Sequence, residues 1–181
     1  SNLSLLGSRN RLIDDFWRTQ KVVNLRENPT YVILDLGCTR SMGSLRAVTA
    51  FINSSWYYGI ECEWKECWTH MSFANSKSEW LQWCILVTFP TNPPVTTTID
   101  VHESGDIPIL MSMPQMMNLG FELNMKEDPI FLSCPTFGYT NERLAFSTSR
   151  HAIVDLAHLK GTTNKDQKVF ATSEVRRHFS M

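Results

Sequence analysis

Residues 31–44, YVILDLGCTRSMGS, decide the fold of this chain, because an apolar run here delivers one carboxylate, Asp35, into a turn that contains glycine. Residues 31–34 are β-branched or otherwise apolar, which is typical of a buried strand. The spacing of apolar side chains in residues 44–52 predicts a short helix directly after the turn. The strand and turn alone do not determine which chemistry the Asp35 carboxylate serves, so the rest of the sequence must be considered.

Segments rich in Thr, Val, Ile and aromatic residues follow, separated by Asn, Pro, Gly or Asp, and this pattern predicts strands. They are residues 56–64, 80–89, 95–101, 121–125 and 130–134, and a short helix is expected in residues 11–20. We therefore predict an all-β fold with one or two short helices. The expected organisation is an N-terminal arm (residues 1–30), one domain (residues 31–160) and a C-terminal tail or linker (residues 161–181).

The composition narrows the class of function. With 181 residues, 43% of them apolar and 19% charged, the chain can bury the core of one globular domain. Its 17 basic and 18 acidic residues give a net charge of about −1, so a nucleic-acid-binding function is not expected. No run of residues is long and apolar enough to predict a membrane span or a signal peptide. We expect a soluble, intracellular protein.

The five cysteines have no regular, even-numbered spacing, which favours reduced thiols over a disulfide framework. Cys62, Cys67, His70 and Cys84 are the residues to weigh as zinc ligands, since zinc prefers four sulfur or imidazole ligands on closely spaced turns. Their spacing is irregular and contains no second paired knuckle. The sequence therefore predicts no metal site and no cofactor.

Methyl transfer is one interpretation of the opening motif. VILDLGC resembles the first strand and turn of an S-adenosylmethionine-dependent methyltransferase, and Glu61 lies 26 residues after Asp35, where such enzymes place an acid for the ribose hydroxyls. Close approach of the backbone to the cofactor usually needs a second glycine in the turn, whereas residues 39–42 here are Thr, Arg, Ser and Met. Strands and long helices also fail to alternate beyond residue 64.

The second half of the chain favours a different chemistry. Residues 107–132, IPILMSMPQMMNLGFELNMKEDPIFL, are arranged as an apolar strand, a short amphipathic helix, a Leu-Gly stop, a strand, an acidic turn and a strand. This order resembles the closing half of a retroviral-type aspartic protease, and LDLGCTRSMGS resembles the Asp-Thr/Ser-Gly catalytic loop of the same family. Together the two motifs make residues 31–156 similar to a retropepsin-like domain of a long-terminal-repeat retroelement, of the copia-like type with an Asp-x-Gly-Cys-Thr-Arg motif.

The resemblance implies one lobe of the acid-protease fold per chain and an active homodimer. Two carboxylates about 3 Å apart cannot both ionise, so a pair of Asp35 residues would share a proton and activate water against a peptide bond. The implied function is hydrolysis of the element's own polyprotein, in the cytoplasm or within virus-like particles. An alternative without catalysis is that Asp35 only stabilises the turn.

The resemblance also implies where a peptide substrate binds. A hairpin that closes over the peptide, the flap, is expected in residues 69–79. The residues expected to contact substrate are Leu36, Gly37, Cys38, Thr39, Phe73, Ala74, Asn75, Leu110 and Ser112.

Four positions depart from the pattern of the family, and one of them is Ser112, which stands where the family has a glycine. Leu36 replaces the Thr or Ser whose hydroxyl bonds across the dimer, so that interaction is missing or replaced. Thr39 and Met113 stand where the family has an acid and an arginine that form an ion pair, and both members are absent together. A retropepsin-like domain that has lost catalysis and serves in binding or assembly is therefore a further interpretation.

Overall fold

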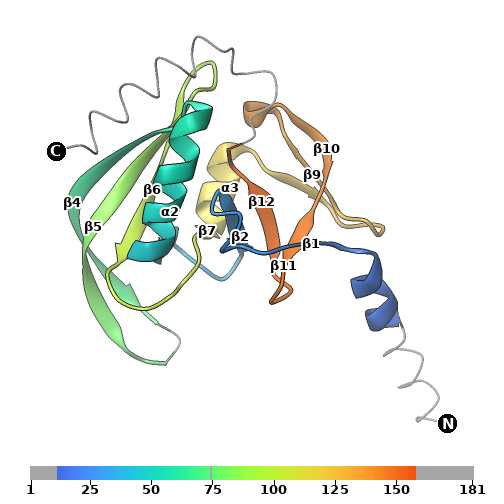
Figure 1. Cartoon of the computed structure of the whole chain (residues 1–181), viewed down its shortest axis with the longest axis horizontal. Coiled ribbons are helices and arrows are strands. Elements are labelled where there is room, and N and C mark those ends of the chain that lie inside the picture. Colours follow the sequence, from blue (N-terminus) through green and yellow to red (C-terminus); the bar gives the residue numbers. More distant parts are fainter. Residues whose placement is uncertain (1–11, 74, 158–181) are drawn as a thin grey trace.

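The computed structural model describes residues 12–73 and 75–157 of the chain. The described residues form mainly β-strands with a few short helices, so the all-β class is confirmed (Figure 1). Residues 1–11 of the expected arm, the expected tail at 161–181 and the expected flap residue Ala74 lie outside the described residues. No helix in the described part of the chain is both long enough and apolar enough to cross a membrane.

Nine strands form one sheet and three form another. The order in the large sheet is β1 (Lys21–Val23), β11 (Ala145–Ser147), β12 (Ala152–Asp155), β2 (Tyr31–Asp35), β7 (Leu110–Ser112), β3 (Met42–Ser44), β6 (Val95–His102), β5 (Ser78–Phe89) and β4 (Glu61–Ser72). The order in the small sheet is β10 (Tyr139–Arg143), β9 (Phe131–Cys134) and β8 (Glu122–Asn124).

Strand β7 lies between β2 and β3, although β2 and β3 follow each other in the chain. It pairs in parallel with β2, which places Ser112 opposite Asp35, and antiparallel with β3, where Leu110 lies opposite Met42. The connection from β2 to β3, residues 36–41, must therefore pass the carboxyl end of β7. This topology brings the two sequence motifs, some 75 residues apart, to one place.

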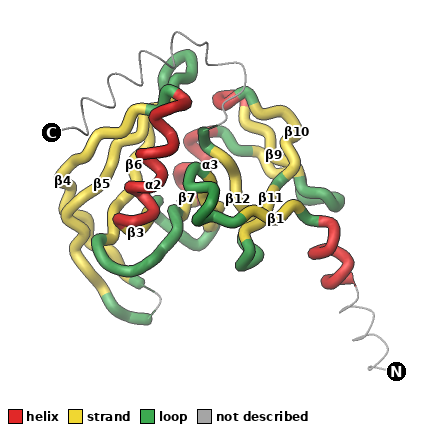
Figure 2. The backbone as a smooth tube through the Cα atoms, in the orientation of Figure 1, coloured by secondary structure: helices red, strands yellow, loops and turns green. Residues whose placement is uncertain are grey.

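Helix α2 (Leu45–Ser55) lies across the part of the sheet formed by β4, β5 and β6 (Figure 2). Ser44 caps its N-terminus by accepting a hydrogen bond from the backbone N–H of Ala47. Its buried apolar side chains join the main core, together with residues of β5 and β6. Val48, Phe51 and Ile52 are the buried apolar residues of this helix. Of the face predicted from the apolar spacing, Val48 and Ile52 are buried, whereas Leu45 is 41% exposed and Phe51 is buried in its place.

Helix α3 (Met113–Leu119) follows β7 directly. Ser112 caps its N-terminus, a proline occupies its first turn, and Gly120 ends it in the left-handed conformation with φ of 77°. The expected Leu-Gly stop is confirmed. Because the cap residue is also the last residue of β7, the start of this helix is fixed beside Asp35.

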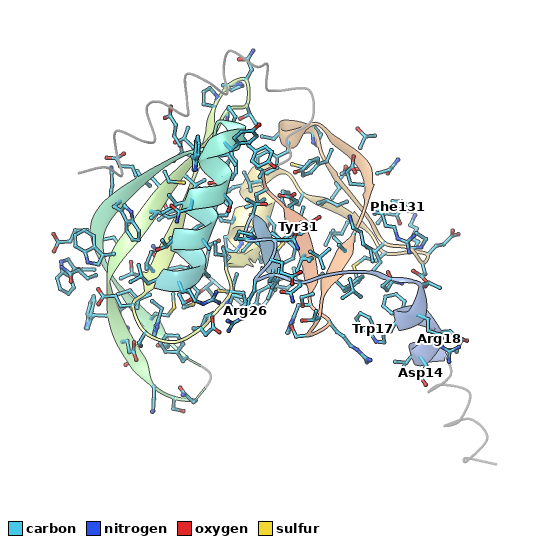
Figure 3. The ribbon with its side chains drawn as sticks, viewed as in Figure 1. Asp14, Trp17, Arg18, Arg26, Tyr31 and Phe131 are labelled. Carbon is cyan, nitrogen blue, oxygen red and sulfur yellow. The ribbon has the colours of Figure 1, made fainter. Side chains whose placement is uncertain are left out.

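The segment before β2 packs against the end of the chain. Residues 12–19 are helical, and the rings of Phe16 and Trp17 make edge-to-face contacts with Phe146. Strand β1 then pairs in parallel with β11, so residues 21–23 of the expected arm extend the large sheet. Figure 3 shows Trp17 close to this edge, with Asp14 and Arg18 on the outer side of the helix.

The strand expected at residues 56–64 starts later in the structure. Trp56–Tyr58 form a turn of 3-10 helix that continues α2, and Gly59 ends it with φ of 83°, before β4 begins at Glu61. The aromatic residues suit a strand, but here the helix continues and Gly59 supplies the reversal. A second 3-10 turn, Pro135–Phe137, places Phe137 in the core between the two sheets.

Candidate active site around Asp35

Strand β2 carries Asp35 from the core to the surface. Val32 and Ile33 are buried, Asp35 is half-buried, and Leu36 and Gly37, which follow it, are exposed. The backbone N–H of Gly37 donates a 2.9 Å hydrogen bond to Oδ1 of Asp35, and that of Cys38 donates to the Asp35 carbonyl at 3.2 Å. One carboxylate oxygen thus holds the turn, as the turn-stabilising interpretation expects. Within the described residues the structure gives Oδ2 no hydrogen-bond donor.

Buried serines tie the loop after Asp35 to the start of α3. Ser41 and Ser112 are both buried, and the backbone N–H of Ser112 donates a 3.0 Å hydrogen bond to Oγ of Ser41. The backbone N–H of Met113 donates to the carbonyl of Cys38 at 3.3 Å. These bonds fix the loop at both of its ends, so Asp35 is held in one position relative to β7 and α3.

An ion pair holds the same loop to β6. Arg40 donates from Nε to Oδ2 of Asp100 at 2.7 Å and from Nη2 to Oδ1 at 3.2 Å. Asp100 is only 1% exposed, whereas half of the Arg40 side chain reaches solvent. The hydrogen bond with Asp100 raises the pKa of Arg40, so the guanidinium stays protonated. No local pattern in the sequence indicates this pair, because its members are 60 residues apart.

The segment expected to form the flap lies in the long hairpin of β4 and β5, whose turn spans residues 73–77. The Phe73 ring contacts the ring of His102 edge to face, with centroids 5.5 Å apart. His102 also contacts Glu79, with 2.8 Å between Nε2 and Oε2. Asn75 accepts a hydrogen bond from the backbone N–H of Lys77 within the turn.

The structure brings together some of the expected site residues and not others. Residues 36–39 form the loop beside Asp35, and Leu110 and Ser112 lie on β7 next to β2. Phe73 and Asn75 lie in the hairpin, and within the described part of the chain neither of them forms a hydrogen bond or ring contact with the loop. Ser112 is buried and uses its hydroxyl to cap α3.

Apolar side chains are exposed on both sides of the bond between Met113 and Cys38. Leu36 is 62% exposed and Met117 is 71% exposed, and Met113 shares an outer face of α3 with Met117. Large apolar side chains exposed beside a polar site are typical of a surface that binds another molecule.

The Cys38 thiol and the Ser41 hydroxyl, both near Asp35, do not have the properties of nucleophiles. Burial is the main reason that the pKa of the Cys38 thiol is raised, and the charge of Asp35 acts in the same direction. A catalytic cysteine needs the opposite shift. Ser41 is buried and bonded to Ser112, so it is not presented to a substrate.

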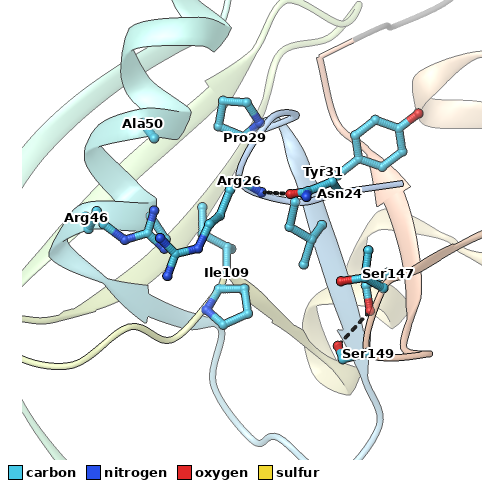
Figure 4. A pocket seen from close by; sticks show the side chains of 13 residues that line it. Asn24, Arg26, Pro29, Tyr31, Arg46, Ala50, Ile109, Ser147 and Ser149 are labelled. Atoms are coloured by element: carbon cyan, nitrogen blue, oxygen red, sulfur yellow. Dashed lines mark hydrogen bonds between the residues drawn. The ribbon is translucent and has the colours of Figure 1, made fainter. Parts of the chain in front are cut away.

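A separate hollow of about 350 Å³ lies where residues 24–31 meet the first turns of α2 and the loop after β11 (Figure 4). Arg26 and Arg46 line one side of it and both bind Asp106. Bonding to Arg46 is the main reason that the pKa of Asp106 is lowered. Ser147 and Ser149 lie on the other side. This hollow does not include Asp35.

Comparisons of the chain with protein-family models, with curated proteins and with solved structures found no match.

Proposed function

We propose that this protein is a retropepsin-like aspartic endopeptidase that acts as a homodimer and cleaves the polyprotein of a retroelement. Asp35 of each chain supplies one carboxylate of the catalytic pair. One carboxylate accepts a proton from water as it attacks the peptide carbonyl, and the other donates a proton, so that the pair acts as base and acid.

The observation that carries the proposal is the pairing of Asp35 with Ser112 in adjacent parallel strands. Each residue belongs to one of the two motifs on which the resemblance rests, and the fold places them side by side. The hydrogen bond from the backbone N–H of Ser112 to Ser41 supports the same proposal, because it attaches the loop after Asp35 to the start of α3 in the second motif. Neither motif alone would require this arrangement.

The requirement for a second chain follows from the single carboxylate. A pair of acids that share a proton needs two aspartates within hydrogen-bond distance, and one chain presents one Asp35 at this surface. Leu36 and Met113 are exposed next to it and offer apolar area for a two-fold contact. In this dimer the Leu36 side chains would pack against each other, in place of the hydroxyl bonds that the family makes.

A peptide substrate would bind in an extended conformation between the β4–β5 hairpin and the loop at residues 36–39. Backbone groups of Gly37 and Thr39 would bond to the peptide, while Phe73 and Asn75 would approach from the hairpin. Leu110 would contribute an apolar wall near Asp35. It lies on β7 opposite Ile33, two residues before the position opposite Asp35.

Two other functions are less well supported. A methyltransferase would need Glu61 beside the glycine turn, but this residue begins β4, which is five strands away from β2 in the sheet. A binding or assembly domain without catalysis is favoured by one observation, that Leu36 offers no hydroxyl to stiffen the loop. The same exposed apolar surface would then serve assembly alone.

The test is cleavage of a peptide library between about pH 4 and 7 by wild type and by Asp35→Asn. We expect a bell-shaped pH profile for the wild type and no cleavage by the variant. Asp14→Asn is the matched control, because Asp14 is an exposed carboxylate on the N-terminal helix (Figure 3). Cleavage that persists in Asp35→Asn, or that is absent from all three proteins, would contradict the proposal.

A further inference from the structure

Two thiols and a carboxylate gather on three adjacent strands of the large sheet. Cys67 lies on β4, Cys84 on β5 and Asp100 on β6, and one ligand atom from each lies within 4.8 Å of the other two. Cys84 and Asp100 face each other directly in the register of β5 and β6. The gathering is therefore a consequence of strand pairing rather than of a flexible surface.

The local backbone brings Cys67 to this group. The register of β4 and β5 shifts between Glu66 and Thr69, and Trp68 in this bulge has φ of 48°. Bulges of this kind redirect side chains and are frequent at functional sites. Cys62, on the same strand, instead belongs to the main apolar core. The zinc set considered from the sequence, with Cys62 and His70, is thus not the set that the structure brings together.

The group already attracts a cation. The Arg40 guanidinium donates hydrogen bonds to both oxygens of Asp100. Thiols that coordinate a metal lose their protons, so Cys67 and Cys84 would bind a metal as thiolates.

We propose that Cys67, Cys84 and Asp100 bind one Zn²⁺ ion, with water as the fourth ligand. Two thiolates and one carboxylate suit a borderline-soft metal, and three protein ligands leave one position open. Sulfur atoms about 2.3 Å from zinc lie roughly 3.8 Å apart in a tetrahedron, so the observed group needs to contract by only about 1 Å. Cys67 is half-buried, which leaves a route for the ion and for the water.

Arg40 is a competitor for the same carboxylate. Half of its side chain is exposed, so the guanidinium can move outward when the metal takes one oxygen of Asp100. The bound ion would join β4, β5 and β6 midway along the long hairpin. This inference does not depend on proteolysis.

The test is titration of the full chain with Co²⁺ under a reductant that keeps thiols free. We expect near-ultraviolet charge transfer from thiolate to cobalt and the visible bands of tetrahedral cobalt, saturating at about one equivalent and lost when Zn²⁺ is added. Cys67→Ser and Cys84→Ser should each weaken the charge-transfer band and lower affinity at least ~10-fold. Cys62→Ser is the matched control, because this thiol lies on the same strand outside the group, and it should leave the band unchanged.

Arg40→Gln gives a result that a purely structural role for the group would not produce. Removing the competing guanidinium should raise Co²⁺ affinity several-fold, and the ion should raise the unfolding temperature of this variant more than that of the wild type. The proposal is overturned if reduced wild type shows no charge-transfer band, or if Cys67→Ser shows a band of equal intensity. The Cys67→Ser protein should fold, because residue 67 is only half-buried.

Discussion

Replacing Arg40 by Gln should destabilise the protein strongly, because Asp100 would lose the partner of both its oxygens. This carboxylate is 1% exposed, and Arg40 donates a hydrogen bond to each of its two oxygens. Removing one member of a buried ion pair costs ~3–5 kcal/mol, and we expect about 3 kcal/mol here because the arginine is half-exposed. For a chain of this length that corresponds to a fall of roughly 6–12 °C in Tm.

The assay is thermal and urea unfolding at neutral pH, with a chelator present so that no metal takes the place of the guanidinium. Arg40→Gln combined with Asp100→Asn should recover about 2 kcal/mol relative to the sum of the single variants, because no unpaired charge is then buried. Arg18→Gln is the control, since its pair with Asp15 is largely exposed, and it should change stability by less than about 1 kcal/mol. A loss below about 1 kcal/mol in Arg40→Gln, or strict additivity in the double variant, would refute this reasoning.

Three further changes test the fold and the site. In Gly43→Ala the new Cβ would lie 2.9 Å from Cγ1 and 3.2 Å from Cα of Ile109, so we expect a loss of ~1–3 kcal/mol in urea unfolding, and an unchanged stability would contradict the close contact of β3 with residue 109. Burial raises the pKa of the Cys62 thiol from 9.0 to about 12, because the folded state favours the neutral thiol. The neutral thiol therefore contributes fully to stability below pH 9, and this contribution is lost as the pH rises toward 12. Cys62→Ala should therefore show a shallower alkaline loss of stability than wild type, and equal slopes would be evidence against the buried thiol. Leu36→Thr restores the hydroxyl of the family's loop and should raise cleavage of the peptide library several-fold, whereas a loss of cleavage would mean that the leucine contact is required.

Local signals in the sequence predicted the elements that carry the candidate site. The apolar run before Asp35 became β2, and Ser44 and Gly120 cap α2 and α3 as their residue types predict. These features depend on neighbouring residues only, so one sequence is enough to find them. The same holds for the hairpin of β4 and β5, where two aromatic, β-branched runs flank a polar turn.

Features that depend on distant residues were not predicted. The Arg40 and Asp100 pair joins a loop to a strand 60 residues away, and neither residue stands in a pattern that indicates the other. The short β1 has no strong strand signal and gains its place by pairing with β11. Trp56–Tyr58 have high strand propensity, yet they continue a helix, because propensity in strands mainly reflects the packing that a site offers.

The central claim is that two chains build one catalytic site from their Asp35 residues. The most direct measurement is the cleavage rate of wild type refolded together with an equal amount of Asp35→Asn, compared with wild type at the same total concentration. If each site needs both carboxylates, random pairing leaves about one quarter of the dimers active, so the rate should fall to about one quarter. A rate of about one half, the value for chains that act independently, would contradict the claim.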